Sequence, residues 1–214
     1  MASFCTSLQD ALELYKDDMY VDFNKFLRDE SYAVARKKDY TQLVECIGYI
    51  DDAMKTKEEW GHTEPMIVYR GMHKNVNMRI YDEFAYSSTS TDISIAAQFS
   101  NDSNIIFSFI IPDDIKYYVY TNNSQEHEVL LQRGIRYTIQ DNTPTIYTYE
   151  IVLSGILHKK TRNVYNVIIS KIPENIIPSY IKKLVFRGGK KHKKTYKNKR
   201  HNKSTRLNKH RIRK

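Results

Sequence analysis

The sequence predicts an α+β domain in which helices precede an antiparallel or split sheet. From Ser7 to about Lys57, apolar residues recur at the three- and four-residue spacing of amphipathic helices. From Met66 onward the apolar segments are shorter and richer in β-branched and aromatic residues, which is typical of strands. Helices first and strands afterwards argue against a doubly wound parallel sheet. The 214 residues are enough for one ordinary domain with a buried core.

The N-terminal helical layer is expected over about residues 7–60. Ser7 followed by Asp10 looks like a capping box at the start of the first helix. The apolar positions at helical spacing are Leu8, Ala11, Leu12, Tyr15, Met19, Phe23, Phe26 and Leu27, followed by Leu43, Val44, Ile47, Ile50 and Met54.

The β core is expected over about residues 65–172. We predict a helix at about 94–100 and strands at 66–69, 105–111, 116–120, 127–131, 135–139, 145–153 and 164–170. Turn chemistry separates these segments at Pro112, Gly134 and Gly155, and in residues 122–123 and 142–144.

The net charge of +9 is divided unevenly along the chain. Residues 187–214 hold 14 Lys or Arg and no acidic residue, whereas 20 basic against 25 acidic residues leave residues 1–186 at −5. A segment with that density of like charges and few apolar residues does not bury enough surface to fold. We therefore predict one domain over residues 1–186 and a disordered basic tail over residues 187–214.

Cysteine content and hydropathy restrict the class further. Cys5 and Cys46 are too few for a disulfide framework, and neither C-x-x-C nor H-E-x-x-H occurs, so we expect a reducing compartment and no metal site. The first 20 residues lack the apolar core of a signal peptide. The longest apolar-dominated run, residues 105–111, is far short of the roughly 20 residues of a membrane-spanning helix. We expect no membrane partner and no secretion by the standard route.

Three short clusters carry residues that bind or react with ligands. In the first, residues 68–72, Arg70 stands near the end of a short apolar strand and directly before Gly71. The arginine can offer a planar, permanently charged fork to a phosphate, and the glycine can let the backbone approach a ligand. Taken alone, this cluster is better explained as a surface arginine at a strand end.

The second cluster is the hydroxyl-rich run at residues 86–92, which contains Ser88, Thr89 and Ser90. These residues can form a strand whose hydroxyl groups orient a neighbouring carboxylate. Alternatively, Ser90, Thr91 or Asp92 merely caps the helix that follows. Capping is the better explanation of this cluster by itself.

The third cluster, residues 125–131, contains Glu126 and Glu128 separated by His127. On a regular strand these two carboxylates would share a face, roughly 7 Å apart, while His127 would point the other way. A pair of carboxylates can divide the work at a glycosidic bond, one stabilising the positive charge on the sugar and the other handling a proton. A solvated strand face is the alternative explanation.

In order along the chain, the three clusters resemble the arginine, S-T-S and E-x-E signature of mono-ADP-ribosyltransferases. The resemblance is to the ADP-ribosyltransferase exoenzymes, which include the enzymatic components of bacterial binary toxins. It covers about residues 8–170, and the order of three individually weak motifs makes it specific. It implies a split antiparallel β core that clasps NAD, with a helical layer on one side and no Rossmann domain.

The resemblance also implies roles at the NAD site. Arg70 would hold the diphosphate of NAD, and Gly71 would approach the nicotinamide with its backbone. Ser88 would aim Glu128, with Thr89 and Ser90 completing the cofactor-binding set. Glu128 would grip the nicotinamide ribose and stabilise an oxocarbenium-like transition state.

A second group of residues would serve the acceptor. Glu126 would position or deprotonate it, and in E-x-E members the acceptor is typically an arginine side chain. Tyr117, Tyr118 and Tyr120 lie where the family recognises its protein target. Gln125 stands one position before Glu126, whereas relatives that modify asparagine have glutamine at the position of Glu126 itself; a one-residue slip would change the acceptor.

The leading hypothesis is transfer of ADP-ribose from NAD to an unknown protein, with arginine as the favoured acceptor. The alternatives are an NAD glycohydrolase and a catalytically idle, nucleic-acid-binding protein. The tail, residues 187–214, has the charge density to bind nucleic acid or to act as a nuclear address, and it resembles the basic tails of giant DNA virus proteins. We therefore expect an intracellular protein, in the host cytoplasm or nucleus, or a component of a virion.

Overall fold

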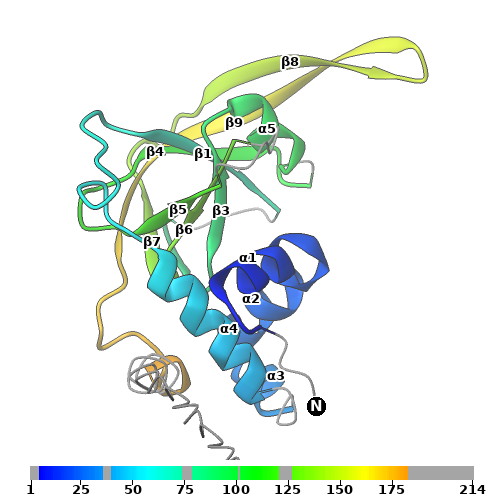
Figure 1. The fold of residues 1–214 in the computed structure, drawn as a ribbon. Coiled ribbons are helices and arrows are strands. Elements are labelled where there is room, and N and C mark those ends of the chain that lie inside the picture. Colours follow the sequence, from blue (N-terminus) through cyan, green and yellow to red (C-terminus); the bar gives the residue numbers. More distant parts are fainter. Residues whose placement is uncertain (1–4, 36–39, 74–78, 101, 121–126, 183–214) are drawn as a thin grey trace, which may run out of the picture.

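The computed structural model describes residues 5–35, 40–73, 79–100, 102–120 and 127–182. Its N-terminal helices pack together beneath the sheet (Figure 1). They are α1 (Leu8–Leu14), the π-helix η1 (Tyr15–Met19), α2 (Tyr20–Arg28), α3 (Glu30–Ala35) and α4 (Tyr40–Ala53). The predicted helical layer is therefore confirmed. Ser7 caps α1 as expected, because its hydroxyl accepts a hydrogen bond from the Asp10 N–H at 3.1 Å.

The strands follow the helices, as predicted. They are β1 (Ile67–Met72), β2 (Ile80–Glu83), β3 (Ser87–Ser90), β4 (Ile105–Ile110), β5 (Tyr117–Val119), β6 (Glu128–Leu131), β7 (Ile135–Ile139), β8 (Thr145–Leu153) and β9 (Ile156–Lys171). A short helix, α5 (Ile93–Gln98), lies between β3 and β4. The α+β fold class is confirmed.

The sheet is split at the long strand β9. The strand order is β2-β7-β9-β4-β1-β3-β6-β5, with β8 paired to β9 as an additional ribbon. Residues 163–166 of β9 pair with β4, whereas residues 167–171 pair with β7, so one strand belongs to both halves. The pairing of β4 with β9 is parallel, and every other described pairing is antiparallel.

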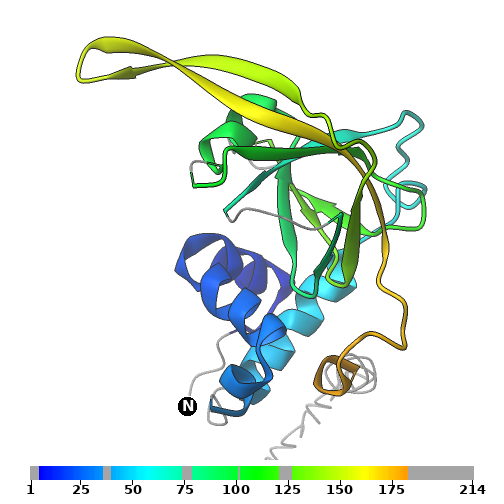
Figure 2. The same cartoon turned by 180° about the vertical axis from the view of Figure 1, so that it is seen from behind.

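Two strand predictions were incomplete. Strand β2 was not predicted, because its four residues are too few to show an alternating pattern. Strand β9 begins at Ile156, eight residues before the predicted start at position 164. Its first residues form a ribbon with β8 that projects from the body in both views (Figure 1 and Figure 2). In this ribbon Ile156 is 62% exposed and Leu157 is 60% exposed. A two-sided exposed ribbon carries no burial pattern that a sequence can reveal.

Cys5 and Cys46 form a disulfide in the structure. The two residues are 41 positions apart, and packing of the segment before α1 against α4 brings their Cα atoms to 5.5 Å. One bond does not make a multi-disulfide framework, in agreement with the sequence analysis. Disulfides persist in oxidising surroundings, whereas the sequence analysis expects a reducing compartment, and the compartment stays a prediction. The sequence could not show the bond, since only tertiary packing brings the segment before α1 against α4.

A buried polar cluster connects the helical layer to the start of β3. The Tyr86 hydroxyl donates to the Asp51 carboxylate at 2.7 Å and to the Ile47 carbonyl at 3.1 Å, both on α4. Arg133, in the turn after β6, binds the same carboxylate through Nε at 3.1 Å and Nη2 at 2.5 Å. Burial of these groups is tolerated because they are paired with one another. The cluster therefore fixes the position of β3 relative to α4.

Some predictions fall outside the described residues. These are the domain boundary at position 186, the basic tail at 187–214 and the loop at 121–126, which includes Glu126. Within the described ranges, no helix has the length and apolar character needed to span a membrane.

Candidate active site

Arg70 lies on β1, between the buried residues Val68 and Met72 on the same strand face. A charged side chain on such a face requires partners. Its Nη1 donates to the Ser88 carbonyl at 3.1 Å, and its Nη2 lies 3.4 Å from a carboxylate oxygen of Glu83. The side chain is 13% exposed, so the guanidinium faces a partly closed space and not the open surface.

The S-T-S segment is strand β3, and its two faces have different partners. Thr89 is buried, and its hydroxyl donates to the Val129 carbonyl of β6 at 2.6 Å. Ser88 and Ser90 lie on the opposite face by the alternation of a strand. The capping alternative also holds, because the Asp92 carboxylate accepts from the Ser94 N–H at 2.8 Å and begins α5. The segment therefore serves both as a strand of the site and as the start of the helix beside it.

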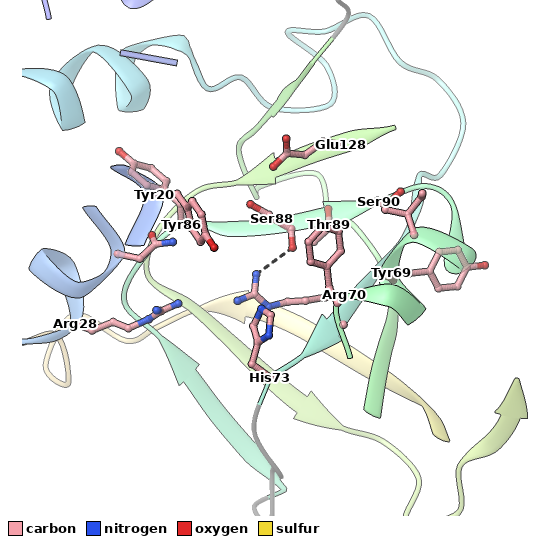
Figure 3. Close-up of a pocket in the computed structure, with 15 residues that line it drawn as sticks. Tyr20, Arg28, Tyr69, Arg70, His73, Tyr86, Ser88, Thr89, Ser90 and Glu128 are labelled. Carbon is pink, nitrogen blue, oxygen red and sulfur yellow. Dashed lines mark hydrogen bonds between the residues drawn. The ribbon is translucent and has the colours of Figure 1, made fainter. Parts of the chain in front are cut away.

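Glu128 is the first residue of β6, and Ser90 lies directly opposite it in the antiparallel ladder with β3. Ser88 pairs with Leu130, which places it one pair further along the same face. Figure 3 shows Glu128 on the far side of Ser88 from Arg70, so that the strand residue stands between the carboxylate and the guanidinium. Three neighbouring strands thus bring the arginine, the serine and the glutamate together.

The backbone before Glu128 differs from the regular strand that the sequence predicts from position 127. His127 has a backbone φ of +46°, in the left-handed region, and β6 begins only at Glu128. The alternation of side chains therefore does not extend backwards through His127, and a shared strand face for Glu126 and Glu128 no longer follows. Glu126 itself lies outside the described residues.

The three strands line a cavity of about 150 Å³. Its walls include Arg70, Gly71, Ser88, Thr89, Ser90 and Glu128, so every described residue predicted for the NAD site contributes. Further residues line the cavity that were not predicted for it. They are Tyr20, Asn24 and Arg28 on α2, Tyr69 on β1, His73 after it, Tyr86 before β3, and Ile95, Ala96 and Phe99 in α5 and at its end. Tyr20 and Phe99 are both 49% exposed and present aromatic surface at the cavity.

The sequence contains a pattern that could have identified the α2 residues lining the cavity. Tyr20, Asn24 and Arg28 are spaced by four residues, which places them on one face of α2. Asn24 is held by the buried Tyr15, whose hydroxyl oxygen accepts a hydrogen bond from the Asn24 amide at 3.0 Å. Burial raises the pKa of Tyr15 to about 12, so its hydroxyl stays protonated at neutral pH.

The structure explains why position 71 is a glycine, which the sequence did not show. A Cβ at this position would lie 2.2 Å from the Ala96 carbonyl oxygen and 2.9 Å from backbone atoms of Phe99 and Ser100. The missing side chain thus makes room for the end of α5, which forms a wall of the cavity. The expectation that Gly71 is a glycine because a ligand approaches it is not needed to explain this residue.

The three tyrosines predicted for target recognition have different surroundings. Tyr117 is fully buried, with its hydroxyl 2.9 Å from the His62 Nδ1 and its ring stacked near Trp60, so it is a core residue and not a surface one. Tyr118 and Tyr120 are partly exposed and meet edge to face at 5.1 Å. The Tyr120 N–H donates to the Glu128 carbonyl at 3.2 Å. Only Tyr118 and Tyr120 remain candidates for contact with a partner.

The site is therefore a cleft with a cationic fork on one side and a carboxylate on the other, walled by aromatic rings. Such a cleft suits a phosphate-bearing ligand with planar rings whose reacting carbon develops positive charge. Among the described residues, no group of three His, Cys, Asp or Glu side chains is placed to hold a metal ion.

Comparison with known families agrees with this class of site. A family profile described as ADP-ribosyltransferase exoenzyme matches residues 3–171. The match covers more than half of the chain, and the chain belongs to this family, whose members are enzymes that use NAD as the ADP-ribose donor. The resemblance indicated by the three clusters is confirmed.

Two solved structures share the fold. The enzymatic component C2-I of the C2 toxin from Clostridium botulinum has a TM-score of 0.51 and 18% identity, covering 77% of this chain and 44% of that one. BECa, an ADP-ribosylating toxin from a binary enterotoxin of C. perfringens, was solved with NADH. Its TM-score is 0.50 and its sequence identity is 18%, and the match covers 77% of this chain and 44% of that one. This chain thus spans less than half of either toxin component. No curated protein sequence matches it.

Proposed function

We propose that this chain transfers a single ADP-ribose from NAD to a protein side chain, with arginine as the acceptor and nicotinamide as the leaving group. The observation that carries the proposal is the convergence of Arg70, Ser88 and Glu128 on one cavity from neighbouring strands. Membership of the ADP-ribosyltransferase exoenzyme family supports the same reaction.

The residues of the cavity fit the NAD donor. Arg70 has a buried Nε with no hydrogen-bond partner among the described residues, so the guanidinium keeps an unused donor beside the cavity. A diphosphate accepts hydrogen bonds from such a fork. Tyr20 and Phe99 offer half-exposed rings against which a planar nicotinamide or adenine ring can stack. The structure of BECa with NADH supports binding of a nicotinamide dinucleotide by this fold.

Glu128 is assigned to the bond-breaking step. The bond between the nicotinamide nitrogen and the ribose carbon breaks, the electron pair leaves with nicotinamide, and positive charge develops on the ribose. A carboxylate held at the start of β6 next to this sugar stabilises that charge without having to reorganise. Ser90, directly across the ladder, and Ser88, on the same face, are placed to orient it.

Glu126 is assigned to the acceptor. The acceptor nitrogen attacks the ribose carbon and gives up one proton, and the Glu126 carboxylate is assigned as the base that takes it. Tyr118 pairs with Leu130 in the ladder of β5 and β6, and Tyr120 follows β5 and hydrogen-bonds to Glu128; both are assigned to contact with the target protein.

The test measures nicotinamide release and labelling of agmatine in parallel for three variants. Glu128→Gln should lose both activities by on the order of 100-fold, because the charge beside the sugar is removed while the shape is kept. Glu126→Gln should still release nicotinamide to water but lose transfer. Glu150→Gln is the matched control, since Glu150 lies on the exposed β8 ribbon, and it should change neither activity.

Each outcome distinguishes one alternative. Nicotinamide release by the wild type without any labelling of agmatine or of a protein extract indicates an NAD glycohydrolase. Neither activity indicates an idle domain, and full transfer by Glu126→Gln removes the case for an arginine acceptor. Arg70→Ala should weaken NAD binding by about 2 kcal/mol, and unchanged affinity in calorimetry would contradict the role of Arg70.

A further inference from the structure

Glu83 is a buried carboxylate to which the proposed reaction assigns no role. It lies on β2, and its side chain is 1% exposed. The Arg28 guanidinium binds it in a bidentate manner, with Nε at 2.8 Å and Nη2 at 2.7 Å, and Arg70 Nη2 lies at 3.4 Å. The Tyr81 hydroxyl at 3.2 Å and the Ala85 N–H at 3.0 Å complete its partners.

Glu83 stays ionised at neutral pH in this environment. Burial acts to raise its pKa, but the hydrogen bonds from Arg28 and the charges of Arg70 and Arg28 outweigh burial and hold the pKa below its ordinary value. The group with its two arginines therefore carries one net positive charge. Removing the carboxylate would leave two guanidinium groups repelling each other at the edge of the cavity.

The position of Glu83 in the fold is unusual for a simple ion pair. In the strand order, β2 lies at one end and β1 is four places away, yet Glu83 contacts Arg70 on β1. It also binds Arg28 on α2, so one carboxylate joins the helical layer and both halves of the split sheet. Both arginines line the cavity, whereas Glu83 is not among the described residues that do.

We propose that Glu83 is a positioning residue for the diphosphate of the donor, acting through Arg70 and Arg28 without touching the ligand. Two nitrogens of the Arg70 guanidinium have partners, since Nη2 contacts Glu83 and Nη1 donates to the Ser88 carbonyl. The orientation of the guanidinium is therefore fixed before a ligand binds. Arg28 is held against the same carboxylate and lines the cavity from α2. A fork fixed in advance loses less entropy when it binds a phosphate. This inference rests on the proposed function.

The neighbouring residue Asp82 provides a matched control. It too forms a bidentate pair with an arginine, since Arg136 binds it through Nε at 2.7 Å and Nη2 at 2.8 Å. Asp82 lies on the other face of β2 and is 22% exposed, and neither member of this pair lines the cavity. Asp82→Asn therefore removes a comparable carboxylate–arginine pair from the same strand without affecting the cavity.

The experiment compares the binding of ADP and adenosine by calorimetry in Glu83→Gln and Asp82→Asn. Glu83→Gln should weaken ADP binding on the order of tenfold and leave adenosine binding unchanged, because only ADP carries the diphosphate. In NAD turnover it should raise KM with little change in kcat. Asp82→Asn should match the wild type throughout. A purely structural role for Glu83 would instead lower both affinities and kcat together.

Glu83→Asp is the second variant, in case Glu83→Gln does not fold. It keeps the buried negative charge but is shorter by one methylene, so it cannot reach both guanidinium groups as Glu83 does. It should fold and should also weaken ADP binding selectively. Wild-type ADP affinity in either Glu83 variant would overturn the positioning role. A wild-type protein that binds neither NAD nor ADP would instead refute the proposed function itself.

Discussion

Gly71→Ala should destabilise the fold before it affects any ligand. The added Cβ would lie 2.2 Å from the Ala96 carbonyl oxygen, which is about 1 Å inside van der Waals contact. The Phe99 carbonyl carbon and the Ser100 nitrogen at 2.9 Å block the alternative directions. All three are backbone atoms, so no side-chain rotation relieves the overlap and α5 has to move away from β1.

Overpacking of this kind costs typically 1–3 kcal/mol, and because only backbone can yield we expect a value near the upper end, about 3 kcal/mol. For a domain of this size that corresponds to a fall in melting temperature of about 10 °C. Urea unfolding followed by the fluorescence of Trp60, the single tryptophan of the chain, measures the change directly.

Gly48→Ala is the matched control. Gly48 lies inside α4 with nothing within 4 Å of the added Cβ, so alanine there should raise stability by up to about 1 kcal/mol through helix propensity. If Gly71→Ala unfolds at the wild-type urea concentration while NAD binding is lost, the glycine serves the ligand and the argument from α5 is refuted.

Three further predictions concern other parts of the chain. Replacing Cys5 and Cys46 by serine should lower stability by about 4 kcal/mol under oxidising conditions, as expected for a crosslink spanning 41 residues, and should make no difference relative to the reduced wild type. The stability advantage of the wild type over Glu83→Gln should be complete above pH 4.5, the ordinary pKa of a glutamate, and should shrink as the pH falls through the lowered pKa, which urea unfolding at pH 7 and pH 3 checks. Truncation after Phe186 should leave NAD turnover unchanged and abolish salt-sensitive binding to nucleic acid; loss of turnover, or a full-length protein that ignores nucleic acid at low salt, would contradict this division.

The order of elements could be predicted from the sequence because local patterns determine it. Apolar spacing of three and four gave the helices from Leu8 to Ala53, and runs of β-branched and aromatic residues gave seven of the nine strands. Strand β2 was not predicted, β3 was predicted only as one of two alternatives, and β9 was predicted without its first eight residues. The partners of β2 and of the first part of β9, and not their own composition, make these segments strands. Residues 156–162 become a strand because β8 pairs with them.

The residues of the candidate site could also be identified from the sequence, since Arg70, Ser88 and Glu128 each stand in a recognisable motif. The contacts among these residues could not be predicted from the sequence. Which serine lies opposite Glu128 depends on the register between β3 and β6, and that register gives Ser90. The start of β6 at Glu128, after a residue with positive φ, is likewise a property of the folded backbone.

Tertiary structure alone decided the contacts between distant segments. The sequence determined that the chain has a cation, a hydroxyl-rich strand and carboxylates in the right order, because each is a local pattern. It could not show that Glu83 joins Arg28 to Arg70, that Cys5 meets Cys46, or that Gly71 accommodates α5. These contacts join residues 13 to 55 positions apart, and only packing of the helical layer and the split sheet brings them together.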